Sequence, residues 1–441
     1  MNRIIKLLSF LVLCVSSCGM VAKPSLCNAA EADKLTIFVT GNILSSLKPC
    51  GCMEEQLGGF ERRGVIFNSA PADKRLILDS GNMIEKISEQ DLIKFEIIMR
   101  ALALLDYDLV NFNRLDLDAA EQSGLLNQTA VQVISCCSHD DVNFPSGFSR
   151  KFRLGDADLA VTVATFDIET APADQISELF AFPDSAEGQV RILLLNSYDR
   201  QQIMEIAAMN VADVIICPTG SDEPEVLNNS EFGSLVVSVG RLGEYIGRIS
   251  VVYGSDGRVK LAYTWQAVAE NLAEDKRLVE LYQEYQLIVR DAKLLENYPR
   301  FSLPDGLEYI DSGACGICHE HRYNNEMWSK RKHSRAFATL EKVGSQYDPE
   351  CVICHTVGME YEQGFVNEIQ TPEFKNVGCE NCHGPGSEHM LTLGKAKTRG
   401  PLSECIDCHT PQRSAEFIEK EQWYRQEIVH WLEPNTVSIV E

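Results

Sequence analysis

The run Cys379-Glu380-Asn381-Cys382-His383-Gly384-Pro385-Gly386-Ser387-Glu388-His389 determines how the C-terminal part of this 441-residue chain folds. It opens with the pattern Cys-x-x-Cys-His, which occurs four times between Cys315 and His409. Two thiols separated by two residues match the two vinyl groups of one porphyrin, and the next histidine reaches the iron. The sequence therefore predicts four covalently attached haem c groups.

The repeated pattern predicts which cysteines attach the haems and which histidines are the proximal ligands of the haem irons. The attachment residues are Cys315, Cys318, Cys351, Cys354, Cys379, Cys382, Cys405 and Cys408, and the proximal ligands are His319, His355, His383 and His409. Disulfides or zinc sites are the alternative, but they leave the regularly placed histidines unexplained. Apolar side chains become sparse after Phe301, so the four haem macrocycles would also supply the hydrophobic core of this segment. We therefore expect this segment to be unfolded without its haems.

Further histidines in the same segment are candidate distal ligands, namely His321, His333, His389 and His430. Their number allows two axial histidines on every iron. However, His321 follows the proximal His319 by two residues and cannot reach the opposite face of the same haem. It serves another haem or is exposed. His430 lies on a predicted helix over Gln422–Trp431, and a surface position is an equal alternative for it.

The C-terminal segment resembles the cytochrome c554 family of tetrahaem cytochromes over about residues 310–435. The run Trp328-Ser329-(x3)-His333-(x2)-Ala336 is similar to that family's stretch after its first haem, which implies that His333 is a distal ligand. In the family's third-haem signature the trailing histidine, here His389, ligates another haem. The resemblance implies electron transfer between neighbouring haems. It also implies one five-coordinate haem that binds carbon monoxide or nitric oxide, the alternative being four low-spin haems.

Residues 34–269 alternate apolar strands with helical stretches, which predicts an α/β sandwich. One helix is predicted over Asp91–Leu105. The predicted strands are Leu35–Thr40, Arg75–Asp79, Leu109–Phe112, Val131–Ser135, Leu159–Thr165, Arg191–Leu195 and Val214–Cys217. Three closing strands, Leu235–Val239, Gly247–Val252 and Val259–Trp265, are predicted to be antiparallel.

This region resembles the metallophosphatase domain of the 5'-nucleotidase family over residues 35–267, which implies an α/β/β/α sandwich. The resemblance is strongest at Leu76–Gly81, at Tyr107–Asn111, and at Leu235–Gly240 with Tyr245–Arg248. The family needs Asp, His and Asn ligands for two divalent metals. In their places this chain has Asn42-Ile43-Leu44, Gly81-Asn82, Arg114-Leu115-Asp116 and Pro218-Thr219-Gly220-Ser221. We therefore expect a retained scaffold without nucleotidase activity.

Two further thiol pairs follow strands of this region, Cys50-Gly51-Cys52 after the first strand and Cys136-Cys137 after a later one. In the family fold both loops approach the edge that holds the metals. The thiols could form a metal site or a redox pair fed by the haems. Structural disulfide bonding in an oxidising compartment is an equal alternative. Cys27 and Cys217 fit that alternative, because they make the unassigned thiols even in number.

A connector is predicted over residues 270–300, with its helix at 271–297, where apolar side chains recur at helical spacing. It has fewer than about three heptads, too few for a coiled coil. We therefore expect its apolar stripe to pack on one of the two flanking domains. Tyr298-Pro299 ends the helix, and the tetrahaem domain is predicted over residues 303–441.

Residues 1–17 carry Arg3 and Lys6 ahead of a short apolar run, as is typical of a secretory signal. The following Val15-Ser16-Ser17-Cys18-Gly19 resembles a bacterial lipobox, which implies lipidation at Cys18. Cleavage near Ala29–Ala32 is the alternative. We expect an exported protein in the periplasm, or on the outer membrane or cell surface, of a Gram-negative bacterium. Its membrane contact would be through the lipid anchor.

The chain is acidic, with Lys+Arg 40 against Asp+Glu 64 and a net charge of -24. Such a charge disfavours nucleic acid as a partner. The sequence thus predicts an electron carrier with redox protein partners rather than an enzyme. The alternative is an oxidoreductase that acts on a small nitrogen or oxygen ligand at an open haem, or at the thiols described above.

Overall fold

The computed structural model describes residues 34–49, 56–139, 142–170, 175–180, 188–228, 233–254, 258–304, 306–320, 328–399, 405–410 and 414–428. Several predicted features lie outside these ranges: the signal segment with Cys18, the thiols of Cys50 and Cys52, and the candidate ligands His321 and His430. Within the described ranges, no helix is both long enough and apolar enough to cross a membrane.

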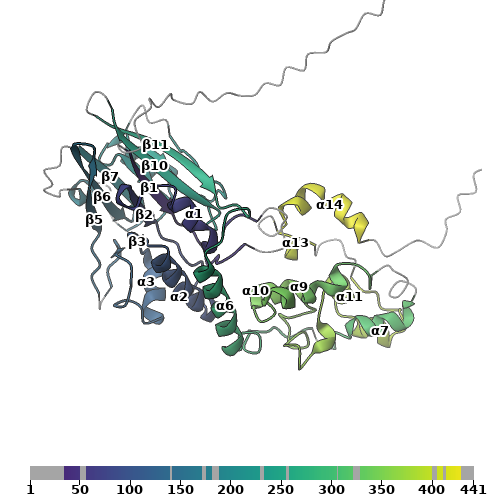
Figure 1. Cartoon of the computed structure of the whole chain (residues 1–441). Coiled ribbons are helices and arrows are strands. Elements are labelled where there is room, and N and C mark those ends of the chain that lie inside the picture. Colours follow the sequence, from purple (N-terminus) through teal and green to yellow (C-terminus); the bar gives the residue numbers. More distant parts are fainter. Residues whose placement is uncertain are drawn as a thin grey trace, which may run out of the picture.

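The N-terminal part is an α/β/β/α sandwich, as the sequence predicts (Figure 1). The first sheet has the order β11 (Val259–Ala267), β10 (Tyr245–Tyr253), β1 (Lys34–Thr40), β2 (Arg75–Asp79), β3 (Leu109–Asn111) and β4 (Val133–Ile134). The second sheet has the order β5 (Gly147–Leu154), β6 (Ala157–Phe166), β7 (Gly188–Leu195), β8 (Val214–Ile216) and β9 (Leu235–Val237). Alternate apolar side chains of both sheets, among them Ile37, Leu78, Val161 and Ile192, form the core between them.

Helices cover both outer faces of this sandwich. The first sheet is covered by α1 (Arg63–Phe67), α2 (Glu89–Leu104) and α3 (Arg114–Gln122), whose apolar side chains share one cluster with the sheet. The second sheet is covered by α4 (Ile176–Leu179) and α5 (Arg200–Ala208). Side-chain caps begin the longer helices, with Ser88 accepting from the Asp91 N–H ahead of α2 and Asp199 accepting from the Gln202 N–H ahead of α5.

Two details of the sheets differ from the sequence prediction. Strand β5 was not predicted, because Arg150, Lys151 and Arg153 interrupt its apolar alternation at an edge of the second sheet. The prediction that Leu235–Val239 belongs to an antiparallel group is wrong, since β9 pairs parallel with β8. The chain crosses to the first sheet only afterwards, where β10 and β11 are antiparallel as predicted.

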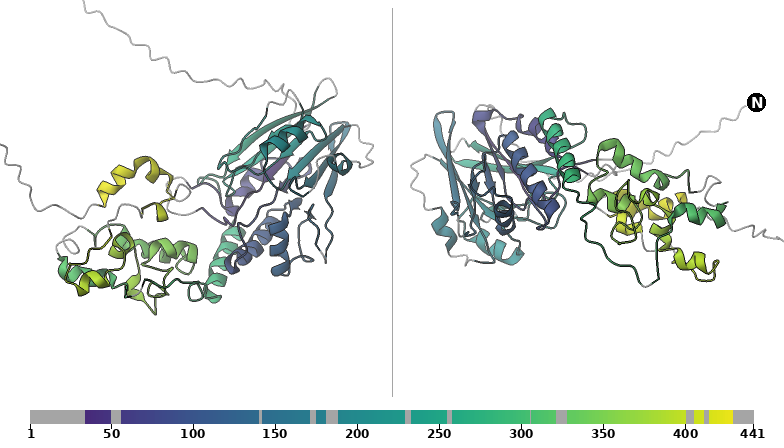
Figure 2. Two further views of the ribbon diagram at one scale, coloured as in Figure 1. Left: turned by 180° about the vertical axis from the view of Figure 1, so that it is seen from behind. Right: turned by 90° about the horizontal axis from the view of Figure 1, so that it is seen from below.

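Helix α6 (Lys276–Asp291) joins the sandwich to the C-terminal part and is shorter than predicted. It begins at Lys276 because Asp275 caps it, accepting a hydrogen bond from the Arg277 N–H. Its buried stripe of Leu278, Leu281, Tyr285 and Val289 belongs to the same apolar cluster as α2. The expectation that the stripe packs on one flanking part is confirmed, and the views in Figure 2 place the helix at the junction.

The C-terminal part consists of short helices with irregular links (Figure 1). They are α7 (Asp311–Cys318), α9 (Ala336–Val343), α10 (Pro349–His355), α11 (Cys379–His383), α12 (Ser387–Leu391), α13 (Cys405–Cys408) and α14 (Ala415–Glu427). The predicted helix over Gln422–Trp431 therefore begins earlier, at Ala415. The apolar cluster of this part is small, built around Phe337, Val352 and Phe365. That is the composition expected where side chains alone do not form the core.

Candidate haem-binding site

Each Cys-x-x-Cys-His motif lies on a helical turn, in α7, α10, α11 or α13. Helical geometry places residues three and four apart on one face, so the two thiols and the histidine face the same side. The backbone continues this turn to the histidine itself. The His319 N–H donates to the Cys315 carbonyl at 3.0 Å and the His409 N–H donates to the Cys405 carbonyl at 2.8 Å. The motifs are thus preformed for binding one face of a planar group.

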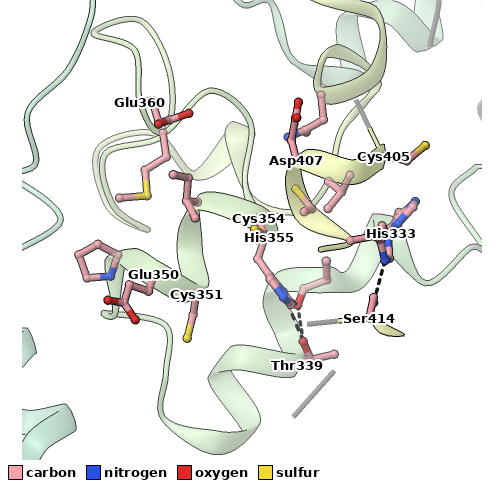
Figure 3. A pocket seen from close by; sticks show the side chains of 18 of the residues that line it. His333, Thr339, Glu350, Cys351, Cys354, His355, Glu360, Cys405, Asp407 and Ser414 are labelled. Carbon is pink, nitrogen blue, oxygen red and sulfur yellow. Dashed lines mark hydrogen bonds between the residues drawn. The ribbon is translucent and has the colours of Figure 1, made fainter. Parts of the chain in front are cut away.

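A cavity of about 1880 Å³ lies among the helices of the second, third and fourth motifs. Its walls include Cys351, Cys354, His355, Cys382, Cys405, Cys408, His409 and His333. Figure 3 shows the α10 residues on one side of this space, with Cys405 and His333 on another. Small-molecule sites rarely exceed about 1,000 Å³. The size of the cavity, with thiols and imidazoles in its walls, fits large thiol-linked cofactors.

Two pairs of imidazole rings face each other at the same separation. The ring centroids of His319 and His389 are 6.1 Å apart with an interplanar angle of 17°. Those of His333 and His409 are also 6.1 Å apart, at 54°. A metal–imidazole bond is about 2 Å long, so two imidazoles on opposite sides of one metal ion have centroids roughly 6 Å apart. The centroid separation of each pair therefore matches the separation expected for two axial imidazoles of one metal ion.

In three histidines of this part, the Nδ1 atom is hydrogen-bonded to a backbone carbonyl oxygen. The Nδ1 atoms of His355, His383 and His389 lie 2.7, 3.2 and 2.8 Å from the carbonyl oxygens of Ala336, Arg399 and Ala396. A carbonyl only accepts, so Nδ1 carries the proton and Nε2 keeps its lone pair. This is the tautomer that metal-ligating histidines adopt. The sequence could not reveal these partners, because backbone carbonyls carry no residue signature.

The fourth proximal histidine has a side-chain partner instead. The Nδ1 atom of His409 is 3.0 Å from the Ser414 hydroxyl. Burial lowers the pKa of His409, and burial together with neighbouring His409 lowers the pKa of His333. Both rings are therefore kept neutral, which is the form that binds a metal.

Glu380, inside the third motif, is a functional residue that sequence reasoning missed. Its carboxylate accepts hydrogen bonds from the N–H groups of Ile310 at 3.0 Å, Asp311 at 3.1 Å and Gly386 at 2.7 Å. The side chain is 3% exposed, and burial raises its pKa. Glu380 thereby ties α11 to the start of α7, so the third motif lies directly against the first.

The first and third motifs also touch through their leading cysteines. The Cys379 N–H donates to the Ser312 hydroxyl at 3.0 Å, and the Cys315 and Cys379 side chains interact with each other. A sulfur–sulfur contact between two attachment residues places the edges of the corresponding cofactor sites together. The arrangement suits transfer of electrons between neighbouring groups.

At the edge of the sandwich where the resemblance described above implied metal ligands, three asparagines are hydrogen-bonded to one another. Asn82 donates from Nδ2 to Asn42 Oδ1 at 2.8 Å and accepts from Asn113. Asn42 and Asn82 have φ of 51° and 59°, a left-handed conformation that asparagine tolerates better than most residues. Asparagine therefore suits the left-handed backbone at both positions. The uncharged side-chain amides of the two residues are also hydrogen-bonded to each other.

Two buried carboxyl groups remain beside these asparagines. Asp116 accepts from the N–H groups of Asn82 at 3.0 Å and Met83 at 2.9 Å, and burial raises its pKa to about 7. Asp79 accepts from the Thr40 hydroxyl at 2.6 Å, and burial also raises its pKa. Across the part of the chain that the structure describes, no three His, Cys, Asp or Glu residues are grouped to hold a metal ion.

Of the four predicted edge thiols, the structure describes Cys136 and Cys137, which follow β4 as free thiols. Because Cys50 and Cys52 lie outside the described ranges, a gathering of all four thiols stays a prediction.

The C-terminal part matches a known family. Residues 314–384 match the model described as "Cytochrome c554 and c-prime". Cytochrome c-554 of Nitrosomonas europaea is 31% identical over 114 residues, which are 22% of this chain and 46% of that protein. The chain thus spans less than half the length of this curated relative.

Solved structures similar to the chain include nucleotidases. A 5'-nucleotidase precursor from Thermus thermophilus has 15% identity and a TM-score of 0.47, covering 64% of this chain and 62% of that one. The NAD nucleotidase of Haemophilus influenzae has 13% identity and a TM-score of 0.47, covering 64% of both chains. Identities this low say nothing about activity. What the family match does identify is a cytochrome c554 domain in the C-terminal part of this chain.

Proposed function

We propose that the protein is a multihaem c-type cytochrome that transfers electrons through four covalently attached haems. The observation that carries this proposal is the spacing of 6.1 Å in both imidazole pairs, each containing the histidine of one Cys-x-x-Cys-His motif. When bound, haem supplies the one-electron chemistry. The cysteines hold each group, and the hydrogen bonds at Nδ1 of the histidines orient the ligating nitrogen.

The ring pairs support a ligand assignment. His319 and His389 would share the iron of the first motif, and His409 and His333 that of the fourth. His355 and His383 would be the proximal ligands of the other two. His321 and His430 remain candidate distal ligands. Two axial histidines favour low reduction potentials, because the methionine ligand that raises the potential is not used.

The N-terminal sandwich would act as a scaffold for this electron path. Asp348 caps α10, the helix of the second motif, and accepts from Gln90 Nε2 of α2 at 2.8 Å and from the Tyr285 hydroxyl of α6 at 2.9 Å. Lys94 of α2 pairs with Glu350 at 2.6 Å. The sandwich and the connector thus hold this helix at its first turn. Neutral amides where metal ligands are expected support a non-catalytic role.

Export and anchoring complete the proposal. The signal-like segment and the lipobox support an exported lipoprotein acylated at Cys18, in the periplasm or at the outer membrane or cell surface. Covalent haem attachment agrees with such a compartment. Its partners would be redox proteins, one donating and one accepting electrons, and the net charge of -24 disfavours nucleic acid.

Haem stoichiometry tests the proposal. The pyridine haemochrome spectrum of the purified full-length protein, set against its amino-acid content, is expected to give four haems per chain. A variant with Cys405→Ala and Cys408→Ala should give three, whereas Cys217→Ala, outside the motifs, should leave four. Two or fewer haems in the unaltered protein would refute it. Hydrolysis of a nucleotide that requires divalent metal and is lost in Asp116→Asn would refute the scaffold role.

A further inference from the structure

The start of α14 places two side chains against His409, the proximal histidine of the fourth motif. The ring of Phe417 is stacked on the ring of His409, with 4.5 Å between the centroids and an interplanar angle of 18°. The hydroxyl of Ser414, the residue before the helix, is 3.0 Å from Nδ1 of the same imidazole. One short segment therefore contacts both the face and the edge of this ring.

The surrounding structure holds both of these side chains in place. Phe417 is 5% exposed, and its ring also packs on Tyr424 of the same helix, with 5.7 Å between the centroids. The Phe417 N–H donates to the Ser414 carbonyl at 2.9 Å, and the Ser414 N–H donates to the Thr410 carbonyl at 2.8 Å. Because Thr410 directly follows His409, these backbone bonds fix the stacked ring and the hydroxyl relative to the imidazole.

The two contacts limit how the imidazole can turn. A histidine that ligates a metal through Nε2 is free to rotate only about the metal–nitrogen bond. Nδ1 lies off this axis, so its hydrogen bond to a fixed oxygen selects one orientation of the ring. Rotation would also drive an edge of the imidazole into Phe417, because the two rings are stacked face to face. The orientation of His409 is therefore constrained from two directions.

Three other histidines of this part are oriented in a different way. The Nδ1 atoms of His355, His383 and His389 are hydrogen-bonded to backbone carbonyl oxygens. Such an acceptor is present whatever the side chain of its residue is. At His409, by contrast, both the hydrogen-bond partner and the stacked ring are side chains. The orientation of this imidazole thus depends on which residues occupy positions 414 and 417.

The two imidazole pairs differ in the angle between their rings. His319 and His389 are nearly parallel at 17°, whereas His333 and His409 are turned by 54°. Each imidazole donates π electrons to iron in the direction perpendicular to its own ring. Parallel rings act on the same iron d orbital and separate it strongly from its partner orbital. Rings turned away from each other act on both orbitals, so the separation is smaller and the largest g value of the oxidised low-spin haem is higher.

We propose that Phe417 and Ser414 are positioning residues that keep the His409 ring turned away from its partner His333, which gives the fourth haem an electronic structure different from that of the first. The inference rests on the proposed function, since it requires a haem iron between the two rings. A histidine that ligates through Nε2 donates its Nδ1 proton to Ser414. This hydrogen bond makes the imidazole a stronger electron donor, which lowers the reduction potential of the fourth haem.

Electron paramagnetic resonance of the oxidised full-length holoprotein tests the role of Phe417. A low-spin signal with a larger low-field g value than that of the first haem is expected, and it should be missing when Cys405→Ala and Cys408→Ala remove the fourth haem. Phe417→Leu should shift or broaden this signal alone, whereas Phe417→Tyr, which keeps an aromatic face, should preserve it. Phe374→Leu is the matched control, because Phe374 is 7% exposed and packs on Tyr309, and it should leave the signal unchanged.

A redox titration followed by absorption spectroscopy tests the role of Ser414. Ser414→Ala should raise one of the four midpoint potentials, and Ser414→Thr, which keeps the hydroxyl, should restore it. Four haems with an unmoved signal in Phe417→Leu and unmoved potentials in Ser414→Ala would overturn the positioning role and leave the proposed function intact. A protein that carries no haem at the fourth motif would overturn both.

Discussion

The Tyr285 hydroxyl donates a hydrogen bond of 2.9 Å to the Asp348 carboxylate, and the two side chains are 1% and 8% exposed. One residue belongs to the connector helix α6 and the other caps the helix of the second haem motif. Burial raises the pKa of Tyr285 well above its ordinary value, so the phenol stays a donor at every physiological pH. This bond joins the connector helix, which packs on the sandwich, to the helix of the second motif.

Tyr285→Phe is expected to lower the free energy of unfolding by about 1–3 kcal/mol, since it leaves one oxygen of a buried carboxylate without its donor. Thermal unfolding followed by circular dichroism measures the change. Tyr198→Phe, at a residue 43% exposed, is the matched control and should have no effect. Equal transition temperatures for the two variants would mean that the bond contributes nothing.

Removal of either proposed distal ligand should open one haem. His389→Ala and His333→Ala are each expected to convert one low-spin haem to high spin, because their rings lie 6.1 Å from His319 and His409. Electron paramagnetic resonance of the oxidised protein measures the conversion. Haem content should not change, since the thioether bonds remain. His139→Ala, in the sandwich, is the control, and an unaltered spectrum in His389→Ala would contradict the assignment.

The unaltered protein is expected to contain one five-coordinate haem. Carbon monoxide added to the reduced protein should therefore shift the Soret absorption of about one haem in four, as the resemblance to the tetrahaem family implies. The protein without carbon monoxide is the reference. An entirely low-spin spectrum with no shift on adding carbon monoxide would show that His321, His430 or another side chain fills every axial position.

Asp116 makes the stability of the sandwich depend on pH. Burial raises its pKa to about 7 in the folded state, whereas an unfolded aspartate has a pKa of about 3.9. The protonated form therefore favours folding, with the contribution complete below about pH 4 and lost as the pH rises to 7. In Asp116→Asn this dependence should disappear, although the variant is less stable throughout because a backbone N–H loses its acceptor. Circular dichroism during thermal unfolding measures both profiles, and parallel profiles would contradict the prediction.

The sequence predicted the structure best where apolar residues recur at regular spacing and are buried in the folded protein. Strand β2 has its predicted bounds because it lies between β1 and β3 and its residues after Arg75 are buried. The apolar stripe of α6 also predicted the packing of that helix. The motifs likewise indicated the haem thiols and proximal histidines. The partners of those histidines depend on tertiary contacts, so the pairing of His319 with His389 could not be read from spacing. Glu380 was missed because only the fold brings the N–H groups of Ile310 and Asp311, which are far away in the sequence, to its carboxylate.

The chain of amides from Asn42 through Asn82 to Asn113 has a consequence for the cation requirement of the protein. A cluster of carboxylates at such an edge repels itself until divalent ions neutralise it. Amides carry no charge, so this edge keeps its shape in the presence of a chelator and when calcium, zinc or manganese is scarce. The three asparagines at this edge therefore create no demand for a divalent cation.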